Sequence, residues 1–388
     1  MRRAHNSSRG FTLLELMISA FIGAILLVVA TQVFSRGVKA SWVTSQRAEL
    51  QQDFRAAGSI LQRDVSMAGA GALGQQGIST SAVGLPNTAT RPVYPCSGLV
   101  TCNYINGAPV AYPLSSGAPF LYSIIPGPNL GITINAGQGP SDILTVIYAD
   151  ANLALNCYTG TIDATGTIVT FQLPATLPGT CVTQPAGSAP APLTFNAVGN
   201  PVGLQIGDMI MFGTNAVGVI TANVATCPPT GTNTACYTVT FAATDPGHIN
   251  QPGPGTGNLK QFAVGAGATP SAVRLTAVTY YLDISPSDGV TPRLMRIQSG
   301  KLPAPVAENV VYLKFSYDVY NAGVVQANQA TLPAGTNPGM ITKVNIVHMS
   351  MRSQQSTYGG YQGLDLQTSI AARNLTSQQE YPISGSAY

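Results

Sequence analysis

The sequence is poor in charge and lacks the motifs on which common enzymes and nucleic-acid-binding proteins depend. Of its 388 residues, 9 % are Asp, Glu, Lys or Arg, and the formal net charge is +3. So small a basic excess cannot hold a nucleic acid backbone, and no nucleic acid partner is expected. The chain contains no Cys-x-x-Cys pair, Walker loop, nucleophile elbow or His-Glu-x-x-His helix. We therefore expect no enzyme activity, no cofactor and no metal.

Three weaker signals have a structural explanation as well as a functional one. His248 and His348 have no evident base or orienting partner in the sequence, and His5 lies far from any cysteine. Asp283–Gly289 has two carboxylates and a glycine, which fits a capped hairpin turn better than a calcium loop, although calcium stays an alternative. Gly69–Gly74 matches the dinucleotide fingerprint by its letters, but it follows a predicted helix rather than a strand.

Charge and proline are both absent from a long stretch near the N-terminus. No charged residue lies between Glu15 and Arg36, and no proline precedes Pro86. Residues 11–35 are apolar enough and long enough to span a bilayer as one helix, for which about 20 residues suffice. A carboxylate in such a segment is costly unless it has a partner, so Glu15 is a candidate functional residue.

The residues before this segment form a short basic leader. Residues 1–10 carry Arg2, Arg3 and Arg9, but they have no apolar region and no small-x-small cleavage site, so they do not form an ordinary secretory signal peptide. The whole sequence holds 18 basic and 15 acidic residues, so without these three arginines it would hold 15 of each. A chain without the leader would therefore be neutral.

The junction between the leader and the apolar segment carries a family resemblance. Gly10-Phe11-Thr12-Leu13-Leu14-Glu15, followed by the apolar run, resembles the class III signal of type IV pilins and type II secretion pseudopilins. The resemblance implies that a prepilin peptidase cuts after Gly10 and methylates the new N-terminal amine of Phe11. It also implies that Glu15 pairs with the N-terminal amine of a neighbouring subunit. The alternative is a plain signal anchor in which Glu15 snorkels or is neutralised.

The helical pattern continues beyond the membrane segment. Apolar residues three or four positions apart form one stripe within residues 36–68: Leu50, Phe54, Ala57, Leu61, Val65 and Ala68. Polar residues occupy the opposite face: Arg47, Glu49, Arg55, Arg63 and Ser66. We predict one helix over residues 11–67 that ends at Gly69-Ala70-Gly71, with Trp42 between its halves, at the membrane interface or against the domain. The stripe is expected to lie under a β-sheet.

From residue 69 onward the sequence is typical of a loop-rich β domain. Runs rich in Val, Ile, Thr, Tyr and Phe are bounded by Gly, Pro, Asn and Asp, and helices look scarce. Ten such runs are predicted strands: residues 143–149, 167–173, 208–212, 217–224, 237–242, 273–283, 294–298, 310–320, 342–352 and 366–372. The predicted fold is α+β, with the long N-terminal helix packed on an antiparallel β domain over residues 69–388.

Six cysteines occur in this domain: Cys96, Cys102, Cys157, Cys181, Cys227 and Cys236. An even number fits disulfides in an oxidising compartment. We expect sequential pairing, because each consecutive pair lies in one Gly-, Pro- or Thr-rich stretch, although the sequence cannot choose among the possible connectivities. A zinc site fits less well, since no histidine is clustered with the cysteines.

Shorter segments of the domain resemble the PilW group of minor pilins. They are residues 61–69, 142–148, 279–282, 293–297, 306–317, 344–352 and 371–374, in the order usual for that group. Two loop-rich insertions, about residues 75–135 and 150–270, match nothing in it. The resemblance implies a minor pilin that primes type IV pilus assembly in a tip complex. Its partners would be prepilin peptidase, other minor pilins, the major pilin and, before assembly, the inner membrane.

The resemblance also implies a location and leaves two alternative functions open. The N-terminus would be cytoplasmic, the first helical half would lie in the inner membrane, and the β domain would be periplasmic and then extracellular. A type II secretion pseudopilin of the J type shares the helix and fold, but in a more compact form. A tip adhesin would present the loop-rich middle as a binding surface, with exposed Tyr94, Tyr104, Tyr112 and Tyr122.

Overall fold

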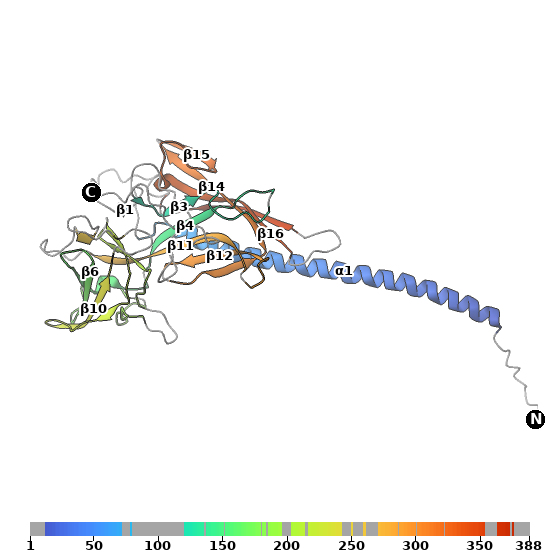
Figure 1. The fold of residues 1–388 in the computed structure, drawn as a ribbon, viewed down its shortest axis with the longest axis horizontal. Coiled ribbons are helices and arrows are strands. Elements are labelled where there is room, and N and C mark those ends of the chain that lie inside the picture. The colour runs from blue at the N-terminus through green and yellow to red at the C-terminus, as the bar shows by residue number, and fades with distance from the viewer. Residues whose placement is uncertain are drawn as a thin grey trace, which may run out of the picture.

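The protein consists of one long helix and a β-rich body around the C-terminal half of that helix (Figure 1). The helix and the antiparallel sheets occupy separate parts of the chain, so the fold is α+β, as predicted. The computed structural model describes residues 12–71, 78–79, 120–135, 137–150, 152–179, 181–183, 185–195, 203–213, 216–242, 250, 259–260, 271–285, 287–299, 301–321, 323–353, 363–372 and 375.

Helix α1 (Leu13–Ser66) is continuous over 54 residues, a length of about 80 Å at about 1.5 Å per residue. It begins and ends within two residues of the prediction. Met67 caps its C-terminus, and Gly69 and Gly71 follow with φ angles of 73° and 67°. Glycine adopts this left-handed conformation without strain, which is why the helix stops here.

The segment that leaves α1 is hydrogen-bonded directly to strand β4 (Ile143–Asp150). The amide of Gly69 donates to the carbonyl of Ile147 at 2.9 Å, and the amide of Ala149 donates to the carbonyl of Ala70 at 2.8 Å. The end of the helix is therefore fixed to the domain by backbone contacts as well as by side chains.

All ten predicted strands are present, with ends that shift by a few residues. They are β4, β6 (Ile168–Pro174), β7 (Met209–Phe212), β8 (Ala216–Val219), β10 (Asn233–Thr240), β11 (Ala272–Ile284), β12 (Pro292–Gln298), β14 (Val310–Asn321), β16 (Ile341–Arg352) and β17 (Gly363–Ala371). The sequence did not predict β1 (Ile78–Ser79), β2 (Phe120–Leu121), β3 (Ile124–Gly127), β5 (Thr159–Ile162), β9 (Ala225–Thr226), β13 (Ala304–Glu308) and β15 (Val324–Gln329). Two short 3-10 helices, η1 (Leu155–Cys157) and η3 (Pro338–Met340), complete the named elements.

The named strands pair antiparallel throughout. A seven-stranded sheet has the order β13-β12-β11-β4-β3. Its remaining two strands are β7, which pairs with the N-terminal end of β11, and β8, which pairs with β7. One four-stranded sheet has the order β15-β14-β16-β17, and another has the order β5-β6-β10-β9. Strands β1 and β2 form a separate pair.

The main core lies between α1 and the two sheets that contain β11 and β14. The predicted stripe is buried, and Ala57, Leu61 and Val65 have no exposed surface. The same core contains residues from both sheets: Leu144, Val278, Leu282, Leu313, Phe315, Val344 and Ile370. Arg55 and Arg63 are exposed, as the prediction for the opposite helix face requires.

Asp142 joins these two sheets. Its side chain is buried, its Oδ2 accepts a hydrogen bond from the amide of Phe315 at 2.9 Å, and its Oδ1 lies 2.7 Å from the Lys314 ammonium. Oδ1 also accepts from the amide of Asn129 at 2.8 Å, while the amide of Asp142 donates to the carbonyl of Leu313. A buried carboxylate with a charged partner and amide donors is stable, so it holds β4 against β14.

A second core lies within residues 153–272, away from α1, around the sheet β5-β6-β10-β9. Phe212 stacks on Phe171 at 6.2 Å between ring centroids and meets Phe241 edge-on at 5.7 Å. This core occupies the insertion for which the sequence found no counterpart among minor pilins. The insertion is therefore a packed unit with its own apolar centre rather than an open loop.

The same insertion contains two disulfides. Cys157 pairs with Cys181 with Cα atoms 4.4 Å apart, and Cys227 pairs with Cys236 at 4.9 Å. These four cysteines pair sequentially, each with the next one in the chain. Cys96 and Cys102 lie outside the described residues.

Replacing Phe54, which is 5 % exposed under the sheet, tests the packing of α1. We expect Phe54→Ala to lower the free energy of unfolding by about 3–5 kcal/mol, because it removes a buried ring and leaves a cavity. The matched control is Arg55→Ala on the exposed face, which should change it by about 0.5 kcal/mol or less. Thermal melting of chains that begin at residue 36 compares the two, and equal melting temperatures would contradict the packing described.

Candidate functional site

The first turn of α1 is closed by a capping box in which Glu15 takes part. The Glu15 amide donates to the Thr12 hydroxyl at 3.3 Å, and the Thr12 amide donates to Glu15 Oε2 at 3.1 Å. The Thr12 hydroxyl also lies 3.0 Å from Oε2. The other carboxylate oxygen, Oε1, has no hydrogen-bond partner within the described chain. The carboxylate is thus held at the start of the helix with one oxygen unused. Gly10 and Phe11 lie outside the described residues.

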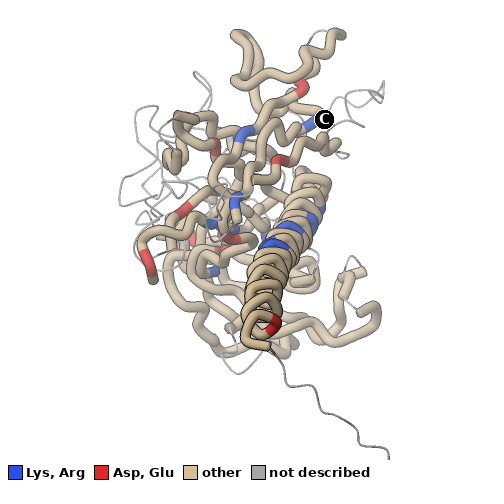
Figure 2. Tube along the Cα trace, turned by 90° about the vertical axis from the view of Figure 1, so that its right-hand side faces the viewer, with Lys and Arg blue, Asp and Glu red and all other residues tan. Residues whose placement is uncertain are grey.

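The helix that follows Glu15 is apolar and uncovered. Leu13 is 77 % exposed, Phe21 69 % and Phe34 75 %. In Figure 2 an uncharged length of α1 separates the acidic position at its start from the first basic positions. By length and composition, this helix can cross a membrane. Exposed apolar surface costs about 25 cal/mol per Å² in water, so the segment requires lipid or other apolar helices around it.

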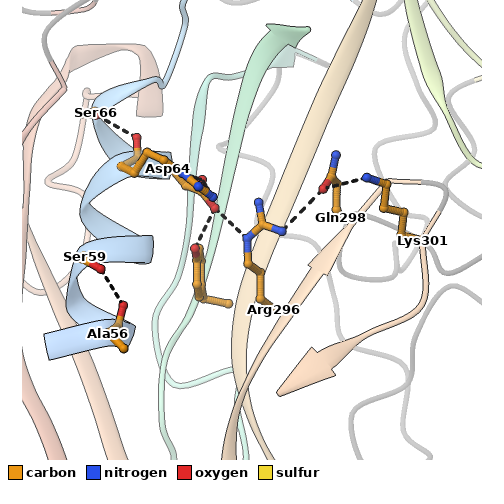
Figure 3. Close-up of polar contacts among 9 residues, drawn as sticks. Ala56, Ser59, Asp64, Ser66, Arg296, Gln298 and Lys301 are labelled. Atoms are coloured by element: carbon orange, nitrogen blue, oxygen red, sulfur yellow. Dashed lines mark hydrogen bonds and ion pairs between the residues drawn. The ribbon is translucent and has the colours of Figure 1, made fainter. Parts of the chain in front are cut away.

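At its other end α1 carries a fully buried carboxylate, Asp64, within the apolar stripe. Its Oδ2 accepts hydrogen bonds from the Tyr280 hydroxyl and from Arg296 Nε, both at 2.7 Å (Figure 3). Its Oδ1 accepts from Arg63 Nε at 3.2 Å. Tyr280 and Arg296 face each other on the paired strands β11 and β12, so Asp64 fixes both the rotation and the height of the helix against the sheet.

The partners of Asp64 keep their protonation states. Burial, together with the Asp64 charge, raises the pKa of Tyr280 well above its usual value, so the hydroxyl stays a donor. Burial opposes the charge on Arg296, but the hydrogen bond and the ion pair with Asp64 outweigh it and raise the pKa of the guanidinium. Because neither partner titrates near neutral pH, this cluster is suited to holding structure rather than to moving protons.

Asp64 is not among the residues predicted from the sequence to be functional, although the sequence contains a signal for it. Asp64 follows Leu61 by three positions, which is the spacing of the stripe, and a carboxylate on a buried face requires partners. The partners themselves could not be named, because Tyr280 lies 216 residues away and Arg296 lies 232 residues away.

His348 has an orienting carboxylate that the sequence did not reveal. Its Nδ1 lies 2.8 Å from Asp365 Oδ2 on the adjacent strand β17. The two side chains are 43 % and 42 % exposed. The Ser350 hydroxyl donates to the same carboxylate rather than to the imidazole, so the three residues do not form a nucleophile–base relay. His5 and His248 lie outside the described residues.

The two carboxylates at the turn between β11 and β12, Asp283 and Asp288, each bind other groups of the protein. Asp288 caps the turn by accepting from the amides of Val290 and Thr291 at 2.9 and 3.0 Å. These bonds, and above all the one from the Thr291 hydroxyl, lower the pKa of Asp288 to about 2. Asp283 instead pairs with Arg293 at 3.4 Å. In the described part of the chain, no group of three or more His, Cys, Asp or Glu side chains is placed to hold a metal ion.

The glycine-rich segment after α1 and the loop tyrosine Tyr122 do not form the binding sites considered for them. Gly69 and Gly71 leave a helix and join a sheet, so over residues 69–71 the strand–turn–helix geometry of a phosphate loop is absent. Tyr122 is 5 % exposed and packs in an apolar cluster, so it does not present a ring for binding, contrary to the adhesin alternative. The other loop tyrosines, Tyr94, Tyr104 and Tyr112, lie outside the described residues.

Comparison with known proteins identifies the N-terminal segment. Residues 5–31 match the prokaryotic N-terminal methylation motif. The match spans the leader junction, Glu15 and most of the apolar run. The motif points to a type IV pilin-like protein, a component of a pilus or a pseudopilus. No curated protein and no solved structure shows significant similarity to the chain.

The motif and the helix give a coarse description of the function. The motif implies processing by a prepilin peptidase and assembly with other pilins, and it indicates a structural protein rather than an enzyme. The uncovered apolar helix fits anchoring in the inner membrane followed by incorporation into a fibre.

Replacing Asp64 tests the contact between helix and domain. We expect Asp64→Ala to lower the free energy of unfolding by about 3–5 kcal/mol, because it leaves Arg296 without its buried partner. Asp53→Ala, which removes an exposed carboxylate from the same helix, is the control and should have little effect. The double variant Asp64→Leu, Arg296→Met should recover part of the loss, since it removes both charges. Thermal melting measures all three, and equal stability of the two alanine variants would contradict the assignment.

Processing gives a second prediction. We expect cleavage between Gly10 and Phe11 and methylation of the new amine, because the methylation motif spans this junction between the basic leader and the apolar segment. The intact mass of protein from its native host should lack Met1–Gly10 and carry one added methyl group. Gly10→Arg, which fills the cleavage position with a long side chain, should retain the leader. Full-length protein in membrane and fibre fractions of the parent would rule the idea out.

Proposed function

We propose that this protein is a minor pilin of a type IV pilus, similar to the PilW group, that takes part in pilus assembly and initiation within a tip complex. The observation that carries the proposal is the geometry of α1. An apolar helix with a single carboxylate in its first turn projects from a folded β domain that covers only its second half. The methylation motif over the same residues supports it.

Assembly follows from the physical chemistry of this helix. In the membrane the apolar face of α1 is satisfied by lipid, and on extraction it packs against the helices of other subunits. Glu15 then lies in an apolar surrounding and requires a positive partner. In the proposed pairing, Oε1, which has no hydrogen-bond partner within the described chain, accepts a hydrogen bond from the N-terminal amine of Phe11 of an adjacent subunit. A buried ion pair of this kind sets the register between helices.

The size and build of the domain favour a minor pilin over the alternatives. The second core within residues 153–272, with its own sheet and disulfides, makes the domain larger than the compact J-type pseudopilin. The burial of Tyr122 weakens the argument for a tip adhesin. In the proposed arrangement the N-terminus is cytoplasmic, and the β domain is periplasmic before assembly and extracellular afterwards.

Glu15→Ala tests the assembly mechanism. We expect normal membrane insertion, because removing a charge eases entry into lipid, and at least about tenfold fewer surface pili. The estimate follows because breaking a buried ion pair costs about 3–5 kcal/mol, and about 1.4 kcal/mol corresponds to tenfold. Pili are counted by electron microscopy at matched protein level, with Ser19→Ala in the same apolar run as the control.

Mass spectrometry of sheared fibres distinguishes the two assembly systems. Peptides of this chain in purified type IV pili support the proposal, whereas their restriction to a secretion pseudopilus supports the J-type alternative. Normal piliation by the Glu15→Ala variant would contradict the proposed role of the carboxylate.

A further inference from the structure

A groove with a volume of about 740 Å³ lies on the outer face of the sheet β15-β14-β16-β17. The inner face of this sheet packs toward α1, since Leu313 and Val344 belong to the main core. Tyr312 and Lys314, which line the groove, flank Leu313 on β14 and therefore point to the opposite side of the sheet. A ligand in this groove does not compete with the packing of the helix.

Strand β16 carries a β-bulge where it lines the groove. The pairing of β14 with β16 shifts between Lys314 and Phe315, which leaves Val347 as an extra residue of β16. With this bulge, the imidazole of His348 lies beside the ring of Tyr312, with ring centroids 6.1 Å apart. Bulges re-aim side chains and are frequent beside functional sites, so this groove has the local build of a binding site.

The charged side chains that line the groove are paired with protein groups. The Lys314 ammonium lies 2.7 Å from Asp142 Oδ1 and donates to Asn129 Oδ1 at 2.6 Å. His348 Nδ1 lies 2.8 Å from Asp365 Oδ2 on β17. A charged ligand would lose water without gaining a counter-ion here, so the groove favours an uncharged ligand.

The other polar side chains around the groove are amides and hydroxyls. Asn345 is held in place, because its Nδ2 donates to the buried Asp318 at 2.9 Å. The side chains of Thr331, Gln367 and Ser369 are exposed at the rim and make no hydrogen bond within the described chain. Amides and hydroxyls supply both donors and acceptors, as the hydroxyl groups of a ligand do.

An aromatic ring beside neutral donors and acceptors matches a saccharide. Sugar hydroxyls donate and accept hydrogen bonds, and the C–H face of a pyranose packs on an aromatic ring. An extended peptide would need free backbone groups at a sheet edge, whereas β14 and β16 are each paired on both sides. The volume also lies within the range of about 300–1,000 Å³ usual for small-molecule sites.

We propose that this groove binds a short neutral oligosaccharide, with Tyr312 as the stacking platform and Gln367 among the hydrogen-bonding groups. The site lies on a sheet face, apart from the loop tyrosines considered for an adhesin. It goes beyond assembly, because it gives the protein a ligand of its own outside the pilus.

Binding of defined tetrasaccharides to the full chain tests the proposal. Protein from native membranes is held in micelles of a detergent without a sugar headgroup, because a glycosidic detergent would compete for the groove. The probes are neutral tetrasaccharides of glucose, galactose, mannose and N-acetylglucosamine, a sulfated tetrasaccharide from heparin, and an uncharged tetrapeptide. Isothermal titration calorimetry should show binding of at least one neutral tetrasaccharide and of neither of the other two probes.

Four variants locate the site. Tyr312→Ala should weaken binding at least about fivefold because the stacking ring is lost, whereas Tyr312→Phe should keep the affinity within about twofold. Gln367→Ala should weaken binding about threefold or more through the lost hydrogen bonds, and it removes only an exposed side chain. Tyr320→Ala is the matched control, because Tyr320 is half-buried on the same strand but outside the groove. Melting temperatures of all four confirm that they fold.

Three results would each overturn the inference: no binding of any neutral tetrasaccharide, tighter binding of the sulfated probe or the peptide, or equal affinities of the Tyr312→Ala, Gln367→Ala and Tyr320→Ala variants. Gln367→Ala keeps the test decisive where Tyr312→Ala disturbs the sheet. None of these results bears on leader cleavage or on incorporation into fibres, which test the proposed function.

Discussion

The arrangement of this protein depends on one constraint: α1 is apolar over a greater length than its own domain covers. The domain buries the stripe from Leu50 onward, whereas the side chains from Leu13 to Phe34 have no cover within the described chain. Uncovered apolar surface of this extent is unfavourable in water. The helix is therefore always shared between its domain and a second apolar environment, which is lipid at first and neighbouring helices in the proposed fibre.

Because α1 is shared in this way, its rotation and height against the domain must be fixed. An apolar stripe supplies most of the free energy of packing, but apolar contacts alone permit small rotations and shifts in height. Asp64 removes that freedom, because its carboxylate is satisfied only where Tyr280 and Arg296 both reach it at 2.7 Å. The backbone bonds of Gly69 and Ala70 to β4 fix the next turn of the chain. The free energy of packing thus comes from the apolar stripe, and the position of the helix comes from Asp64 and these backbone hydrogen bonds.

The elements with a strong local signal could be predicted from the sequence, and those defined by distant contacts could not. Hydrophobic periodicity was sufficient for α1 and for ten strands. Five of the missed strands, β3, β5, β9, β13 and β15, lie at sheet edges, where one neighbour is lacking and the apolar pattern is weaker. The partners of Asp64 and Asp142, the order of the sheets and the groove over β14, β16 and β17 all depend on segments far apart in the chain, which periodicity does not encode.

The second core has a topological consequence. The segment between the end of β4 and the start of β11 contains the second core and also adds β7 and β8 to the edge of the main sheet. At its two ends, Asp150 and Arg274 are paired across β4 and β11 and joined by an ion pair. The two ends of the insertion therefore lie side by side, as the ends of a hairpin loop do. Because the entropy of closing a loop grows slowly with its length, the part of the insertion around β5, β6, β9 and β10 can be enlarged or exchanged while β4 and β11 stay paired. The fold thus lets evolution diversify the end of the molecule farthest from the membrane helix without altering how that helix is held.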